Sequence, residues 1–168
     1  MSQMTLTTAD DRQILVTRAF AAAPALIYQA HTDPSLIQQW MLGPDGWSMP
    51  VCVCDARPGG RLRLEWSNGH GREFYLTGEF LALEPPTRIV HVERMHLPEA
   101  TPDNHIETLF AAAGAGTAMT MRMTLPDAQA RSRMLGTGMA HGMEASYRRL
   151  EGLLRDSQPG RGPTVAPA

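Results

Sequence analysis

Apolar and polar residues alternate along much of the chain, and a period of two predicts β-strands rather than helices. The first such stretch is RQILVTRAF at 12–20. Six further stretches follow it, at 49–56, 61–66, 72–84, 87–95, 105–112 and 117–125. The segments between them, such as RPGG and SNGHG, have the composition of turns. Because no helical pattern interrupts the series, we expect neighbouring strands to pair antiparallel, most clearly in a hairpin across SNGHG.

A different spacing, of three to four residues, predicts helices before and after this series. After the first strand, Pro24 fits the first turn of a helix, and TDP at 32–34 offers a new N-cap followed by a proline. Two short helices are therefore expected, ending before Trp40. From Pro126 to about Leu154, apolar residues recur on one side and predict a single long helix.

Gly136, Gly138 and Gly142 lie inside the predicted long helix. Each glycine costs about 1 kcal/mol relative to alanine in a helix interior. Two explanations are open: the glycines leave space for close packing or for a ligand, or they mark a kink in the helix.

Together these elements predict an α+β fold of the helix-grip type. A curved antiparallel sheet of about seven strands would wrap around the long C-terminal helix, with the two short helices after the first strand at one end. Residues 12–155 would form one domain. Residues 1–11 are expected to be a flexible leader, and residues 156–168, which lack an apolar pattern, a disordered tail.

Composition narrows the classes of function without naming one. Apolar residues make up 43% and charged residues 19% of the chain, with a net charge of −2, so a nucleic-acid partner is not expected. No stretch approaches the roughly 20 apolar residues of a membrane span, and acids stand near the start where a signal peptide carries cations. We therefore expect a cytoplasmic protein with no membrane partner.

The cysteines and histidines do not have the spacing of a metal site. Cys52 and Cys54 form a Cys-x-Cys pair, while His31 and His141 lie far from it in sequence. A zinc site normally takes paired ligands at short, fixed spacings, so structural thiols and a helix-surface histidine are the preferred interpretation. Neither a metal nor an organic cofactor is expected.

The alternation also assigns a face to each strand, because residues two apart share a side. The apolar set is expected to point inward and to line a cavity: Leu64, Trp66, Phe74, Leu76, Phe80, Phe110, Met119 and Met121, with Met139 and Met143 from the long helix. Methionines adapt to guests of different shape, which is typical of promiscuous binding sites. Methionines also fill gaps in ordinary cores, and this alternative is open for each of them.

The loop QQWMLGPDGWSMP at 38–50 holds two of the three tryptophans beside a Gly-Pro-Asp-Gly turn. If the short helices close one end of the grip, Trp40, Met41 and Trp47 lie near the mouth of the cavity and contact a ligand there. The alternative is that both tryptophans cover the edge of the core, each burying on the order of 200 Å².

His91 and Glu93 are the candidate catalytic residues. They share one face of the strand at 87–95, and either orientation of that strand fits the pattern. Pointing inward, they would be polar groups in an apolar cavity, able to orient a ligand or to act as acid and base in a cyclisation or dehydration. Facing solvent, or paired with an arginine such as Arg94 or Arg122, they would be structural.

Several segments resemble, in their order and spacing, the START-like (SRPBCC) superfamily. Within it they are similar to the branch of heat-shock-protein ATPase activator homologues, which is related to polyketide cyclases. The segments are VTRAFAAAPALIYQAHTDPSLIQQWM, GPDGW, ARPGGRLRL, GEFLALEPPTRIVH and MAHGMEASYRRLEGLL, which together span 14–154. The resemblance implies a helix-grip fold around a cavity for hydrophobic or amphipathic molecules. It implies no single reaction, because the superfamily contains binding proteins, aromatases/cyclases and chaperone co-factors.

The leading hypothesis is therefore a protein that binds a hydrophobic or amphipathic small molecule, with no defined reaction. An aromatase/cyclase-like enzyme, acting on a polyketide-type substrate through His91 and Glu93, is the alternative from the enzyme class. A co-factor of a chaperone ATPase is the alternative from the interaction class. Because edge strands of such sheets are often covered by a partner, a homodimer is also compatible with the pattern.

Overall fold

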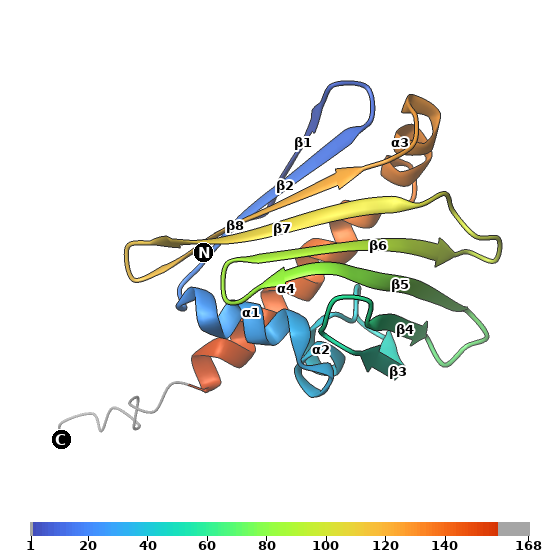
Figure 1. Ribbon diagram of the computed structural model, residues 1–168. Helices are drawn as coiled ribbons and strands as arrows, with labels where there is room; N and C mark the ends of the chain where they lie inside the picture. The colour runs from blue at the N-terminus through green and yellow to red at the C-terminus, as the bar shows by residue number, and fades with distance from the viewer. Residues whose placement is uncertain (1, 158–168) are drawn as a thin grey trace, which may run out of the picture.

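The computed structural model describes residues 2–157 and contains one antiparallel sheet with helices packed against it (Figure 1). The eight strands of this part of the chain follow the order β1-β2-β8-β7-β6-β5-β4-β3 across the sheet. They are β1 Thr5–Ala9, β2 Gln13–Phe20, β3 Ser48–Cys54, β4 Arg61–Ser67, β5 Glu73–Glu84, β6 Arg88–His96, β7 Asn104–Ala113 and β8 Gly116–Thr124. The four helices are α1 Pro24–Thr32, α2 Pro34–Trp40, α3 Ala128–Leu135 and α4 Met139–Asp156.

The predicted α+β helix-grip arrangement is confirmed. A curved antiparallel sheet packs on one side against the C-terminal helix α4, which runs behind the strands in the view of Figure 1. All seven predicted strands are present, with ends that differ from the expected ones by at most two residues. The hairpin across SNGHG joins β4 to β5, whose pairing runs from Arg61 opposite Glu79 to Ser67 opposite Glu73.

An eighth strand, β1, lies where a flexible leader was expected. Thr5–Ala9 pairs antiparallel with β2 at the edge of the sheet, so the prediction for residues 1–11 is wrong over this stretch. The reason lies in the turn: a carboxylate oxygen of Asp10 accepts the backbone N–H groups of Arg12 and Gln13 at 2.7 and 3.0 Å. These hydrogen bonds close a tight hairpin, which the weak alternation of TLTTA does not predict.

The two short helices begin as the sequence predicts. Pro24 and Pro34 occupy first-turn positions of α1 and α2, where the missing N–H group has no intrahelical partner to lose. Asp33 is the N-cap of α2, and its carboxylate accepts the N–H of Ser35 at 2.9 Å. The two helices therefore follow each other with a one-residue break.

The single long helix predicted from Pro126 to Leu154 is wrong, because the chain breaks it into α3 and α4. Gly136 caps the end of α3, and Gly138 has φ of 76°, in the left-handed region that favours glycine. The kink explanation is therefore correct for these two glycines. At the other end, α4 extends to Asp156, the first residue of the predicted disordered tail, and residues 158–168 lie outside the described residues.

The face of the sheet that packs against α4 is called the inner face here, and register arranges its side chains in rows. One row consists of Leu62, Gly78, Glu93 and Asn104, and the next of Phe80, His91, Ile106 and Met123. The sheet and α4 meet through an aromatic contact, in which the rings of Phe20 on β2 and Tyr147 on α4 pack edge to face at 5.7 Å. The core lies between these layers, and the strand at 87–95 therefore points His91 and Glu93 inward.

Candidate functional site

Trp40 lies in the core rather than at a mouth, which corrects one of the predicted contact residues. The side chain is 1% exposed, and its ring stacks on that of Tyr147 at 5.7 Å. The indole N–H donates to the carbonyl oxygen of Ala30 at 2.9 Å. Four residues after Ala30 stands Pro34, which has no N–H to offer that carbonyl, so the indole replaces the missing helical donor. The position of Trp40 therefore agrees with the alternative interpretation, in which the tryptophan belongs to the core.

The rest of the tryptophan loop is fixed to the sheet by aromatic contacts. Trp47 is half-buried and meets Phe74 at 5.2 Å, while Phe74 stacks on Trp66 at 4.9 Å. The indole N–H of Trp66 donates to the carbonyl oxygen of Met41 at 2.8 Å. On the opposite side, the N–H of Gly43 donates to the hydroxyl of Ser146 on α4 at 2.9 Å. The loop therefore bridges the sheet and α4 beside the inner face.

The predicted lining divides into a buried group and a partly accessible group. The buried members besides Trp40 form the apolar floor of the inner face: Leu64, Trp66, Leu76, Phe80, Phe110 and Met119. Six members pack against this core but remain partly accessible, and we call them the accessible apolar set: Met41, Trp47, Phe74, Met121, Met139 and Met143. Four of these six are methionines, so the accessible part of the lining is also its most adaptable part.

His91 and Glu93 form a pair on the inner face. Nε2 of His91 lies 2.9 Å from Oε2 of Glu93, and the side chains are 13% and 14% exposed. The arginine partners considered from the sequence are engaged elsewhere, because Arg94 binds Asp103 and Arg122 lies 3.9 Å from Glu107 on the outer face. Nδ1 of His91 is buried and has no hydrogen-bond partner among the described residues. The pair therefore combines a carboxylate, an imidazole and one free ring nitrogen in apolar surroundings.

The expectation of a helix-surface histidine fits His141, which is exposed on α4, but not His31, whose ring lies among aromatic side chains. The ring centroid is 4.9 Å from that of Trp40 and 5.1 Å from that of Phe110. Nδ1 lies 2.7 Å from the carbonyl oxygen of Ile27, and Nε2 is buried without a partner among the described residues. The pKa of His31 is lowered to about 4, chiefly by burial and to a smaller extent by the nearby His91, against the opposing effect of the hydrogen bond to Ile27. His31 is thus neutral at physiological pH.

Arg18 is a buried cation of the inner face that the sequence reading did not single out. Its guanidinium has no exposed side-chain surface and forms ion pairs with Glu144 at 3.5 Å and Glu151 at 3.1 Å, both on α4. It also lies over the rings of Phe20 and Tyr147, at 5.3 and 5.7 Å. A signal was available, because Arg18 stands at an inward position of the alternating stretch that forms β2. Its charge is balanced within the fold.

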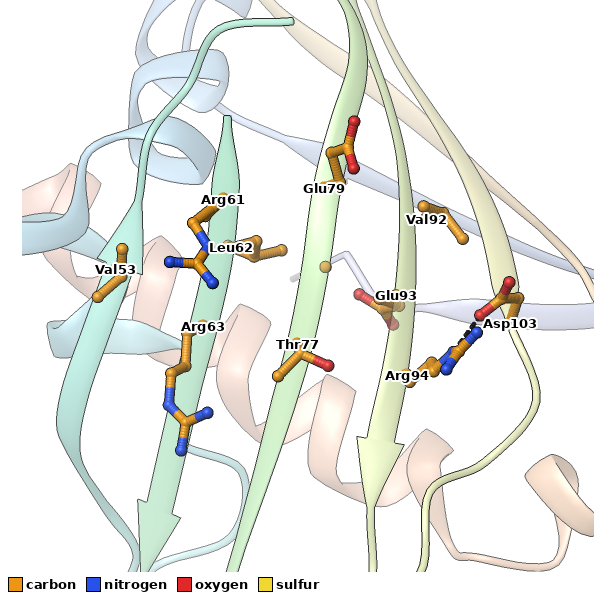
Figure 2. A pocket seen from close by; sticks show the side chains of 11 residues that line it. Val53, Arg61, Leu62, Arg63, Thr77, Glu79, Val92, Glu93, Arg94 and Asp103 are labelled. Carbon is orange, nitrogen blue, oxygen red and sulfur yellow. Dashed lines mark hydrogen bonds and ion pairs between the residues drawn. The ribbon is translucent and has the colours of Figure 1, made fainter. Parts of the chain in front are cut away.

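The structure contains two hollows, one on the outer face of the sheet and one where the end of β2 and the β7–β8 turn meet α4. The larger, of about 630 Å³, is on the outer face of the sheet; Figure 2 shows it with α4 behind the strands. Arg61, Arg63 and Arg94 line it together with the acids Glu79 and Asp103. The second, of about 490 Å³, lies at the end of β2 and is lined by Phe20, Glu151 and Leu154 among others. None of the predicted ligand-contact residues lines either hollow, and of the two candidate catalytic residues only Glu93 lines one, the larger.

The two cysteines behave as structural thiols. Both are free, and Sγ of Cys54 lies 3.3 Å from the carbonyl oxygen of Thr32. Burial raises the pKa of Cys52 to about 11 and that of Cys54 to about 12, so neither is a thiolate at neutral pH. Within residues 2–157, the structure contains no group of three or more His, Cys, Asp or Glu side chains arranged to hold a metal ion. None of the described helices is long and apolar enough to cross a membrane.

The protein has the helix-grip fold. Its antiparallel sheet packs against a C-terminal helix, and the inner face between them is apolar apart from a few polar groups. The sequence model of the family described as Activator of Hsp90 ATPase homolog 1-like protein matches residues 21–155. The chain belongs to this family. The resemblance stated from the sequence segments is thereby confirmed.

Solved structures share the fold over almost their whole length. A protein from Rhodobacter sphaeroides is 28% identical with a TM-score of 0.86, covering 92% of this chain and 99% of that chain. A protein from Mycobacterium smegmatis is 23% identical with a TM-score of 0.82 and the same coverage, 92% and 99%. A protein from Nitrosomonas europaea is 22% identical with a TM-score of 0.77, covering 88% and 97%. No curated protein matches the chain.

Proposed function

We propose that the protein binds a hydrophobic or amphipathic small molecule between the inner face of the sheet and α4. The observation that supports this most directly is the accessible apolar set. Six large apolar side chains from the tryptophan loop, two strands and α4 pack against the core, yet all six keep contact with solvent. Apolar surface on an inward-facing wall gains about 25 cal/mol per Å² when a guest covers it.

The methionines suit such a guest because their side chains are unbranched and polarizable. Met121 rises from the floor of the inner face, while Met139 and Met143 stand on the first turns of α4. Thioethers on opposing elements rearrange at little energetic expense around molecules of different shape. We therefore expect modest selectivity for shape, and orientation of the guest by the few polar groups present.

The proposal can be tested with an uncharged fluorescent probe, N-phenyl-1-naphthylamine, whose emission rises in apolar surroundings. The wild-type protein is expected to give a saturable increase, and Met143→Gln to weaken probe affinity about tenfold because it places an amide on the wall. Leu109→Gln is the matched control, because Leu109 is 39% exposed on the outer face. A native mass spectrum of the purified protein would show whether a small molecule is retained. Equal loss of affinity in both variants, or no saturable binding, contradicts the proposal.

The His91–Glu93 pair favours a second candidate function, an aromatase/cyclase-like reaction on a polyketide-type substrate. An imidazole and a carboxylate in contact at 2.9 Å on the inner face are the groups that proton transfer beside a carbonyl requires. The test is the rate of cyclisation of a linear poly-β-carbonyl thioester with the wild-type protein, His91→Phe and Glu93→Gln. Cyclisation no faster than in buffer, or unchanged rates in both variants, removes this candidate.

A further inference from the structure

The loop tip, which we define as residues 43–46 of the tryptophan loop, lies between members of the accessible apolar set. Met41 and Trp47 flank the tip in the sequence, and both keep contact with solvent. On α4, Met143 comes directly after Gly142, the helix residue that the tip approaches. The tip therefore stands at the boundary between the loop and α4, where apolar side chains of both elements reach the solvent.

Polar contacts hold the tip on α4. The N–H of Gly43 donates to the hydroxyl of Ser146 at 2.9 Å. Arg149 donates twice, through Nη1 to the carbonyl oxygen of Gly43 and through Nη2 to Oδ1 of Asp45 at 2.9 Å. A single side chain, that of Arg149, therefore makes two of these three contacts.

Gly142 lets the tip pack closely on the helix. A Cβ atom at this position would lie 3.8 Å from Cδ of Pro44 and 3.9 Å from Cα of Gly43, which is ordinary van der Waals contact. Gly142, Ser146 and Arg149 are spaced four and three residues apart, so they share one side of α4. That side of the helix carries the tip, and Gly142 leaves space for close packing, one of the explanations that the sequence left open.

The residues that flank the tip are held by the sheet instead. The carbonyl oxygen of Met41 accepts the indole N–H of Trp66 at 2.8 Å, and Trp66 is only 8% exposed. The ring of Trp47 packs on that of Phe74 at 5.2 Å. Both contacts involve aromatic rings that the sheet withdraws from water, so they are costly to break.

The contacts of the tip with α4 are the ones that water can replace. The side chain of Asp45 is fully exposed where it meets Arg149, and exposed ion pairs exchange with water at little net cost. The tip also has a glycine at each end, Gly43 with φ of 73° and Gly46 with φ of 90°. Glycine tolerates large changes of backbone angle, so these two residues can act as hinges. The tip can therefore leave α4 while its flanks stay on the sheet.

We propose that the loop tip is the gate of the inner-face site. It closes the boundary between the loop and α4 through Ser146 and Arg149, and it opens by leaving these two residues while Met41 and Trp47 keep their contacts with the sheet. This inference rests on the proposed small-molecule function and assigns the control of access to the same site.

A gate of this kind sets the rates of binding and leaves the affinity almost unchanged. The contacts that close the tip are made between parts of the protein, so they are the same with and without a guest inside. Weakening them raises the open fraction of the free and of the bound protein by the same factor. Association and dissociation are therefore both accelerated, and their ratio stays constant.

Stopped-flow fluorescence with N-phenyl-1-naphthylamine tests the gate. Arg149→Gln removes the guanidinium that holds Gly43 and Asp45, so both rate constants are expected to rise about tenfold while the affinity changes less than about twofold. Arg148→Gln is the matched control, because Arg148 is 65% exposed and contacts Glu144. Unchanged rates in Arg149→Gln, or a loss of affinity carried by dissociation alone, overturn the gate. If the wild-type protein shows no saturable binding, the proposed function itself fails.

A reversible cross-link tests the gate in the opposite direction. The close approach of Gly142 to Pro44 allows a disulfide in the double variant Pro44→Cys, Gly142→Cys, which the intact mass and a peptide map verify. Oxidation is expected to slow association and dissociation of the probe by about tenfold or more, and reduction with dithiothreitol to restore both. The single variant Gly142→Cys, which cannot form this bridge, is expected to bind alike with and without the reductant. Equal rates for the bridged and the reduced double variant overturn the gate, and the result for Arg149→Gln decides by itself if the bridge does not form.

Discussion

Nη2 of Arg18 on β2 lies 3.1 Å from Oε2 of Glu151 on α4, and this ion pair joins the sheet to its helix. The contact is an ion pair rather than a well-aligned hydrogen bond, because Nη2 and Nε make no hydrogen bond within the described residues. Glu144, about two helical turns before Glu151 on α4, also pairs with Arg18 and accepts the N–H of Met4 at 2.9 Å. One buried cation therefore connects the N-terminal segment, the sheet and α4.

Replacing Arg18 by alanine is expected to destabilise the fold by about 3–5 kcal/mol, because two carboxylates lose their buried partner. Arg148→Ala is the matched control. Arg148 also contacts Glu144, at 3.1 Å, but its side chain is 65% exposed, so its loss is expected to change stability by at most about 0.5 kcal/mol. Urea unfolding of both variants measures the difference. Similar free energies of unfolding for the two variants contradict a role for Arg18 as the tie between layers.

The lowered pKa of His31 predicts a dependence of stability on pH with a definite sign. The unfolded histidine, with a pKa of 6.5, binds a proton before the folded one, whose pKa is about 4. Stability is therefore greatest above pH 6.5 and falls as the pH drops from 6.5 toward 4, by up to about 3 kcal/mol. Urea unfolding between pH 7.5 and pH 4.5, in roughly half-unit steps, measures this fall.

The appropriate comparison for this pH series is His31→Leu, which removes the titrating group, against His70→Ala, which removes an exposed histidine in the β4–β5 turn. We expect the first variant to flatten the fall in stability and the second to preserve it. The carboxyls of Asp10, Asp33 and Asp103, whose pKa values lie below 3.8 because of hydrogen bonds and Arg94, act only at lower pH. An unchanged slope in His31→Leu would refute burial as the cause.

The strand series was predictable because its signals are local. Alternation at 61–66 and the glycines of SNGHG together determine both the face of β4 and the register of the hairpin. By contrast, β1 depends on two hydrogen bonds that the Asp10 carboxylate accepts from the backbone, and a sequence of threonines with one leucine gives no pattern of its own. Glycines marked the place where α3 and α4 separate, but glycine also allows close packing, so the sequence did not distinguish a kink from a packed helix.

The polar groups of the site were predictable only in part. Their alternation grouped His91 with Glu93 on one face, and the pairing of β6 between β5 and β7 then decided which face is inward. His31 was not predictable, since its role depends on rings brought from α2, β7 and α4. The position of Trp40 depends on the carbonyl oxygen of Ala30, which Pro34 leaves without a helical donor. The sequence shows the missing donor, but not that the indole of Trp40, ten residues after Ala30, replaces it.

Gly78 lies in the middle of the inner face, and a side chain there is expected to destabilise the sheet. A Cβ atom at this position would lie 2.6 Å from the carbonyl oxygen of Val92, and the backbone of β6 cannot move away without losing its pairing. Gly78→Ala is expected to cost about 1–3 kcal/mol. Guanidinium unfolding with an unchanged m-value measures the loss.

Gly152 is the natural control for this substitution, because a Cβ atom there would meet nothing within 4 Å and the residue lies inside α4. Gly152→Ala is expected to stabilise the protein by about 0.4–1 kcal/mol through higher helix propensity and a less flexible unfolded chain. A destabilising Gly152→Ala, or a neutral Gly78→Ala, would contradict the packing described for these two positions.

Trp40 and Trp47 are expected to respond differently to the same substitution, because only Trp40 is a core residue. Trp40→Phe removes the donor to the carbonyl oxygen of Ala30 and part of the stack on Tyr147, so it is expected to lower the free energy of unfolding by about 2 kcal/mol. Trp47→Phe changes a half-buried ring, so it is expected to cost less than about 1 kcal/mol while weakening probe binding about threefold. Urea unfolding and titration with N-phenyl-1-naphthylamine on both variants separate the two roles. A Trp40→Phe variant with unchanged stability and weakened probe binding would place Trp40 at the mouth after all, and would reverse the division between buried floor and accessible apolar set.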